Sequence, residues 1–157
     1  MTHSSLQSLG VLLEHAERER DQARVRLQRA ELALNNAQTQ AEQLQQYRTE
    51  SDQRWNAQAR QGISIALLQC HQQFSGRLHG AVGQQDQQLA RLQADQQRRQ
   101  AELLACELRV ASVRKLLERR SGVLQQQAER SEQKQLDERS SRATWQRQAD
   151  LSAAGSA

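Results

Sequence analysis

Apolar residues recur three and four positions apart along most of this chain, which is the spacing of a heptad repeat. Starting at Leu6, eight heptads keep one register as far as Gln58. Their first positions, called a, are Leu6, Leu13, Arg20, Leu27, Leu34, Ala41, Arg48 and Trp55, and their fourth positions, called d, are Leu9, Ala16, Ala23, Ala30, Ala37, Leu44, Ser51 and Gln58. An unbroken heptad pattern is typical of a left-handed coiled coil, whose seam consists of the a and d residues. We therefore predict one long helix over residues 6–60.

The pattern breaks over residues 61–64, Gln-Gly-Ile-Ser. Gly62 can adopt the left-handed conformation that ends a helix, and Ser64 is a favourable N-cap for the next one. A connection this short makes the two flanking helices antiparallel neighbours. The sequence therefore predicts a turn at residues 61–64.

The three-four spacing resumes after the turn and predicts a second helix over residues 65–145. The seam positions of this helix are Leu68, His71, Ser75, Leu78, Val82, Gln85, Leu89, Leu92, Gln96, Arg99, Leu103, Cys106, Val110, Val113, Leu117, Arg120 and Leu124. In a hairpin that folds at Gly62, residue i lies opposite roughly residue 124 − i. The second helix therefore overhangs after about residue 120, and we expect residues 1–5 and 146–157 to be disordered. The predicted fold class is all-α, a long antiparallel two-helix coiled coil.

Composition supports this fold and argues against a compact enzyme. The chain has no proline, 36% hydrophobic residues and only 3% aromatic residues. Long helices are possible without proline, and the apolar content supplies one stripe per helix but no large core with a pocket. The net charge is +4, with the basic surplus in the second helix. That surplus is compatible with an acidic protein, a membrane surface or nucleic acid, or with a simple solvated face.

Motifs that carry catalysis or bind metals are missing from the sequence. There is no HExxH, CxxC or glycine-rich phosphate loop, and His71 and His79 lie eight residues apart, a poor spacing for a shared metal on one helix. We expect neither enzymatic activity nor a cofactor. Two cysteines do not make a disulfide framework, and no apolar stretch approaches the roughly 20 residues of a membrane helix. The cytoplasm is therefore the expected compartment.

Phe74 stands out because it lies one residue off the seam. With Leu78, Ala81 and Gln85 it forms a stripe beside the coil. An exposed aromatic residue on a stripe of smaller residues is typical of a binding hot spot on a helix face. The alternative is that Phe74 folds back over the turn. Trp145 is either an anchor for a partner or part of an unstructured tail, and the sequence leaves both possibilities open.

The segment Gly62-Ile63-Ser64, followed by His71-Gln72-Gln73-Phe74 and Leu78, resembles the central signature of the FliJ family of flagellar type III export proteins. Two further segments fit the layout of that family, Leu44-Gln45-Gln46-Tyr47-Arg48 and Leu136-Asp137-Glu138 with Arg142-Ala143. His71 stands where the family usually has tyrosine.

The resemblance implies a non-enzymatic cytoplasmic stalk of the flagellar export apparatus, peripheral at the inner face of the cell membrane. Its expected partners are the hexameric export ATPase, the cytoplasmic domain of the export-gate membrane protein, and export chaperones. Family contacts to the gate correspond to Phe74, Leu78, Ala81 and Gln85, the last in place of a usual histidine. The ATPase-facing end is expected where the two helix termini meet, near Leu9, Leu13, Leu116 and Leu124.

Three other functions remain open at this point. The homologous stalk of a virulence-type secretion system shares the architecture. A plain homo-oligomeric coiled-coil scaffold would show the same heptads. A coil associated with nucleic acid is disfavoured, because glutamine dilutes the basic charge and aromatic stacking platforms are missing. We expect no nucleic-acid partner.

Overall fold

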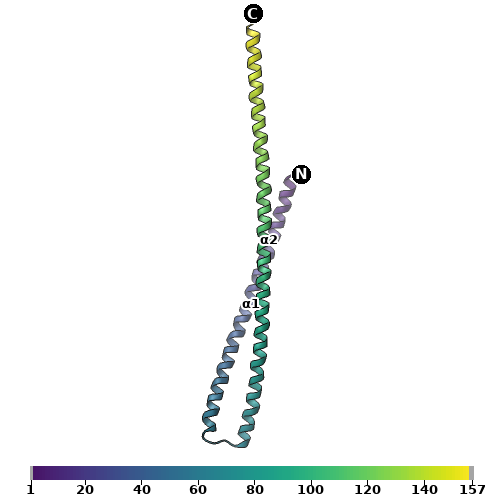
Figure 1. The fold of residues 1–157 in the computed structure, drawn as a ribbon. Helices are drawn as coiled ribbons and strands as arrows, with labels where there is room; N and C mark the ends of the chain where they lie inside the picture. Colours follow the sequence, from purple (N-terminus) through teal and green to yellow (C-terminus); the bar gives the residue numbers. More distant parts are fainter. Residues whose placement is uncertain (1, 156–157) are drawn as a thin grey trace. The chain divides into compact units, whose positions relative to one another are not determined.

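The computed structural model describes residues 2–155, and nearly all of them are helical. Helix α1 spans Thr2–Ala59 and helix α2 spans Ile65–Ala154, 58 and 90 residues long. The two helices are antiparallel and form a helical hairpin in which α2 is the longer arm (Figure 1). The predicted fold class is therefore confirmed. No strand occurs between residues 2 and 155.

The turn has the chemistry that the sequence indicated. Gly62 has a φ angle of +93°, which lies in the left-handed region that residues other than glycine rarely adopt. The Ser64 hydroxyl oxygen accepts a hydrogen bond from the Leu67 backbone N–H at 3.2 Å, which caps the start of α2. The Gly62 N–H donates to the Ala59 carbonyl at 3.2 Å as α1 ends. Helix termination and helix initiation are thus completed within residues 60–64.

Both helices extend further than the heptad pattern suggested. α1 begins at Thr2 instead of residue 6, and α2 continues to Ala154 instead of residue 145. Residues 2–5 and 146–154, for which we expected disorder, are thus helical in this structure, whereas residues 1 and 156–157 lie outside the described part. The reason is that residues 146–154 contain neither proline nor glycine, so nothing stops the helix before Gly155.

The structure divides into two compact units. Unit 1 contains residues 1–16 and 109–157, and unit 2 contains residues 17–108. In each unit a piece of α1 packs against a piece of α2. The buried residues of unit 1 are Leu9, Ala16, Val110 and Val113, and those of unit 2 are Ala23, Ala30, Ala37 and Val82. All eight are predicted seam residues, so the heptad register identified the core correctly.

Small side chains dominate the buried seam. Four of the five buried residues of α1 are alanines at successive d positions, Ala16, Ala23, Ala30 and Ala37. An alanine buries little apolar area, so each contributes less to stability than a buried leucine, which provides about 1.5–3 kcal/mol. The α1 a positions beside them are all half-buried. The hairpin is consequently held by many weak contacts along its length.

Arginines at two seam positions are satisfied within their own helices. Arg20 pairs with Asp21 at 3.0 Å. Arg99 pairs with Asp95 at 3.6 Å and with Glu102 at 3.1 Å. Their aliphatic stems can cover apolar surface while the guanidinium groups remain paired. These charges therefore fit the seam without an unpaired buried group.

The C-terminal part of α2 extends beyond its contact with α1. From residue 125 to residue 155 every side chain is exposed except that of Ala143, which is half-buried. We call residues 128–154 the overhang. Within residues 2–155, neither helix has the length of apolar sequence needed to cross a bilayer.

Candidate protein-binding surfaces

Tyr47 of α1 and Phe74 of α2 form an aromatic pair in unit 2. Their ring centroids lie 6.2 Å apart and their planes meet at 77°, an edge-to-face arrangement. Tyr47 is 51% exposed and Phe74 is 39% exposed. Edge-to-face packing is a favourable geometry for two aromatic rings. The pair therefore presents a preformed apolar surface, made by both helices, close to the turn.

The sequence indicated Phe74 as a contact residue but gave no such role to Tyr47. A signal was available, because Tyr47 immediately precedes the seam residue Arg48 just as Phe74 immediately precedes Ser75. Positions directly before a seam residue flank the seam, and in an antiparallel pair the flanking positions of the two helices meet. To pair Tyr47 with Phe74, the sequence would also have had to show how far α1 is shifted along α2.

The four stripe residues of α2 occupy two different environments. Phe74 and Ala81 are exposed, whereas Leu78 and Gln85 are half-buried. The Gln85 side-chain amide donates a hydrogen bond from Nε2 to the Ala37 carbonyl oxygen at 3.0 Å. Gln85 thus faces the seam and links the two helices. The aromatic pair together with Leu78 and Ala81 is called the aromatic surface below.

A stacked pair supports this surface on the side of the turn. The Trp55 indole and the His71 imidazole are parallel, with ring centroids 3.8 Å apart and planes within 1°. Both residues are half-buried seam residues. His71 precedes Phe74 by three residues, so the stack lies within one turn of α2 from the aromatic ring. It fixes the alignment of α1 and α2 where the aromatic surface is built.

The residue numbers of these pairs test the expected alignment. The two residue numbers add up to 126 for Trp55 with His71, to 122 for Ala37 with Gln85 and to 121 for Tyr47 with Phe74. The sequence predicted a sum of roughly 124 for facing residues. The expected pairing is therefore correct to within about one helical turn.

The four leucines expected near the helix termini all belong to unit 1. Leu9 is buried in the core, Leu13 and Leu124 are half-buried, and Leu116 is exposed. Of the four, Leu116 has the largest exposed fraction, 41%. Leu9 contributes to packing.

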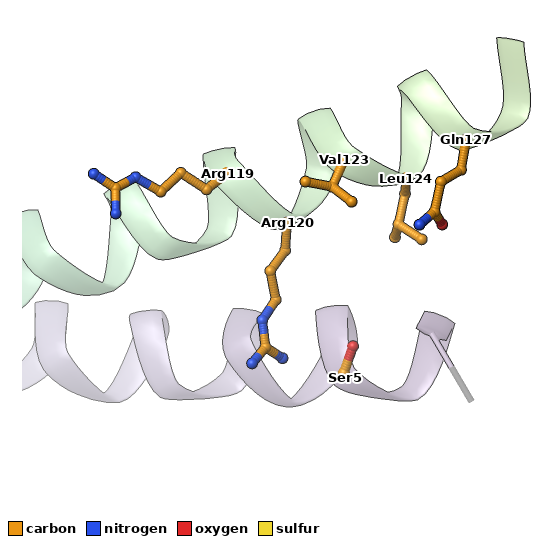
Figure 2. Close-up of a pocket in the computed structure, with 6 residues that line it drawn as sticks. All are labelled: Ser5, Arg119, Arg120, Val123, Leu124 and Gln127. Atoms are coloured by element: carbon orange, nitrogen blue, oxygen red, sulfur yellow. The ribbon is translucent and has the colours of Figure 1, made fainter. Parts of the chain in front are cut away.

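A groove lies in unit 1 beside the beginning of α1. It has a volume of about 340 Å³ and is lined by Ser5, Arg119, Arg120, Val123, Leu124 and Gln127. Figure 2 shows Arg120, Leu124 and Gln127 extending from α2 toward α1, while Arg119 extends along α2. We call it the arginine groove. Among its residues the sequence named only Leu124 as a candidate contact and placed Arg120 in the seam, because nothing in a heptad pattern reveals where α1 begins against α2.

The described residues contain little that suggests catalysis. Between residues 2 and 155, no three His, Cys, Asp or Glu side chains are grouped so that they could hold a metal ion. Cys70 is exposed and Cys106 is half-buried, and each is a free thiol. The surfaces with distinctive chemistry are therefore the aromatic surface and the arginine groove, and both are suited to contact with proteins.

Comparison with known protein families gives a match over most of the chain. The model of the family described as "Flagellar FliJ protein" matches residues 5–149. That range includes the turn, the aromatic surface and the arginine groove. No curated protein and no solved structure was found to match the chain.

Proposed function

The chain belongs to the flagellar FliJ protein family, non-catalytic components of the flagellar export apparatus, and from this premise we propose that it connects the export ATPase to the export gate. In this role it binds the ATPase hexamer and the cytoplasmic domain of the gate protein, and it escorts unloaded export chaperones. It works in the cytoplasm and reaches the inner face of the membrane through its partners. A connector of this kind needs two separate binding surfaces on a stable support.

The observation that carries this proposal is the exposed aromatic pair. Tyr47 and Phe74 are large apolar side chains held in place by each other and by the neighbouring stack of Trp55 on His71. Rigid aromatic residues lose little conformational entropy on binding and are enriched among hot spots. Leu78 and Ala81 extend the same side of α2. This surface is the proposed gate contact.

Gln85 takes a different role in the proposal. Its amide already bonds the Ala37 carbonyl across the seam, so it supports the helix pair behind the surface. A gate contact by Gln85 would require this bond to break or to be shared. We therefore assign the gate contact to Phe74, Tyr47 and Ala81 first, with Leu78 contributing its exposed portion.

The proposed ATPase contact belongs to unit 1. Leu116 offers exposed apolar surface there, and Leu13 and Leu124 in the same unit are half-buried. Leu9 is buried in the seam between the two helices. Arg119 and Arg120 follow Leu116 on α2, and their charge favours association with an acidic surface and raises the association rate more than the final affinity.

The experiment is a binding titration of the purified cytoplasmic domain of the gate with the wild-type chain and with Phe74→Ala. We expect Phe74→Ala to weaken binding about tenfold or more, which corresponds to about 1.4 kcal/mol. The matched control is Leu104→Ala, which truncates another exposed apolar residue of α2 in unit 2. Equal binding by wild type and Phe74→Ala, with both chains fully helical, contradicts the proposed gate contact.

A plain scaffold is the alternative that the same protein preparation can test. A homo-oligomeric coil self-associates through its exposed apolar residues, whereas a connector remains monomeric until it meets a partner. Sedimentation equilibrium over a range of concentrations distinguishes these outcomes. A stable oligomer that is lost in Phe74→Ala would assign the aromatic surface to self-association.

A further inference from the structure

The arginine groove combines apolar surface with positive charge. Val123 is 53% exposed and Leu116, seven residues earlier on α2, is also exposed. Residues seven apart on an α-helix lie on the same side, two turns from each other. Leu124 adds a half-buried floor between α2 and the start of α1. α2 therefore presents an apolar strip that α1 leaves uncovered.

Arg119 and Arg120 have no ion-pair partner among the described residues. Among residues 2–155, neither takes part in a side-chain hydrogen bond. The α2 segment 115–127 contains three basic residues, Lys115, Arg119 and Arg120, and one acidic residue, Glu118, which gives a net charge of +2. The segment 121–157 has five basic and five acidic residues, a net charge of zero. The positive charge is thus concentrated beside the groove.

From these features we propose that the arginine groove binds an acidic amphipathic helix of a partner protein. A third helix laid against α2 covers Leu116 and Val123 with its own apolar face, a common mode of helix recognition. Carboxylates flanking that face meet Arg119 and Arg120, whose planar guanidinium groups bond carboxylates with two parallel hydrogen bonds. The site thus selects both the shape and the charge of its partner.

Two other occupants fit the groove less well. A membrane surface requires an extended basic face, but the positive charge stops at the groove and the overhang is neutral. A second copy of the chain could supply only its own helices, in which acidic residues are interspersed with basic ones. An acidic helix matches the local charge, and the other two occupants become outcomes of the test.

This inference deepens the proposed function, and rests on it, in one respect: it gives the chemistry of the segment that occupies the ATPase-facing end. The geometry of the groove does not depend on which protein supplies that segment. A probe with the required chemistry therefore tests the groove, and a separate binding assay with the ATPase tests the identity of the partner. If the probe binds and the ATPase does not, the groove stands and the ATPase assignment fails. If the ATPase binds and the probe does not, the ATPase assignment stands and the proposed chemistry of the groove fails.

The probe is a fluorescently labelled synthetic helical peptide with leucine at the a and d positions and glutamate at the flanking positions. Fluorescence anisotropy with the full chain should show saturable binding. Arg119→Glu with Arg120→Glu, and separately Val123→Asp, should each weaken binding at least tenfold. The matched control is Arg139→Glu with Arg142→Glu, an equal charge change in the overhang, which should leave binding unchanged. The same peptide with lysine in place of glutamate should not bind.

Several results would overturn the inference. If the double variant Arg119→Glu with Arg120→Glu (the groove pair) and the double variant Arg139→Glu with Arg142→Glu (the overhang pair) weaken binding equally, the attraction is unspecific. Binding of the lysine peptide has the same meaning. No saturable binding of the glutamate peptide removes the site. A dimer in sedimentation that Val123→Asp disrupts assigns the groove to a second copy. Binding to phosphatidylserine vesicles that is lost in the groove pair, without peptide binding, assigns it to a membrane. Circular dichroism verifies that every variant remains helical, which the exposure of Arg119, Arg120 and Val123 leads us to expect.

Discussion

The Trp55 indole lies flat on the His71 imidazole, with 3.8 Å between the ring centroids and 1° between the planes. This contact joins α1 to α2 next to the turn, where the seam otherwise contains polar residues such as Ser51 and Ser75 and the exposed Leu68. The stack therefore replaces the leucine packing that is lacking there. It also holds α2 in place three residues before Phe74.

Replacement of Trp55 by alanine should lower the free energy of unfolding by about 1–2 kcal/mol, because the stack and the apolar area of the indole are both lost. Urea denaturation followed by far-UV circular dichroism measures this change. The control is Trp145→Ala, since Trp145 is 75% exposed in the overhang and should have almost no effect. Similar changes for both variants would show that the stack adds nothing to stability.

Replacement of Gln85 by alanine should lower the free energy of unfolding by about 1 kcal/mol, since it removes a hydrogen bond that spans the two helices. Gln85→Glu should cost more, because a carboxylate cannot donate to the Ala37 carbonyl oxygen. The exposed neighbour Gln84 provides the control, and Gln84→Ala should be close to neutral. If Gln84→Ala and Gln85→Ala have the same free energy of unfolding in urea, the hydrogen bond across the seam does not contribute to stability.

Two glycines should respond to alanine in opposite directions. Gly62→Ala forces a side chain into a positive φ angle and should destabilise the hairpin by about 1–2 kcal/mol. Gly80 lies inside α2, where an added Cβ meets open space, so Gly80→Ala should stabilise the chain by up to about 1 kcal/mol. Denaturant midpoints of the two variants provide the comparison. A change of the same sign in both would contradict the assigned turn.

The overhang should exchange its backbone amides much faster than the seam. Residues 128–154 are exposed apart from Ala143, and a helix without tertiary contacts is marginally stable in water. Hydrogen–deuterium exchange should therefore show strong protection around Ala23–Ala37 and weak protection in the overhang. A chain that ends at Gln127 should retain its free energy of unfolding. Equal protection of both regions would indicate that the overhang packs on something in the free protein.

The heptad pattern predicted which residues of each helix form the seam, because burial in a two-helix coil follows the a and d positions directly. The left-handed Gly62 and the N-cap Ser64 were also predictable, since their chemistry is local. The outer ends of the two helices, at Thr2 and Ala154, were not predictable. Heptads report where a partner helix packs, while the helix itself continues to Ala154 because its own sequence does not stop it.

The candidate sites were predicted only in part, and the reason is the alignment between the helices. Phe74 could be placed beside the seam from α2 alone. Its contact with Tyr47 and the bond from Gln85 to Ala37 depend on how far α1 is shifted along α2, which a repeat of seven residues does not fix. The arginine groove depends in addition on where α1 begins. Such features require the three-dimensional structure.

The central claim is that this chain connects two proteins, and a bridging measurement tests it most directly. The export ATPase is immobilised on a sensor surface, and the cytoplasmic domain of the gate is added with or without the chain. The account predicts that gate protein is retained only when the wild-type chain is present. Phe74→Ala should remain bound to the ATPase but should retain at least tenfold less gate protein at subsaturating concentration. If the wild-type chain binds the ATPase and still recruits no gate protein, it is not the proposed connector.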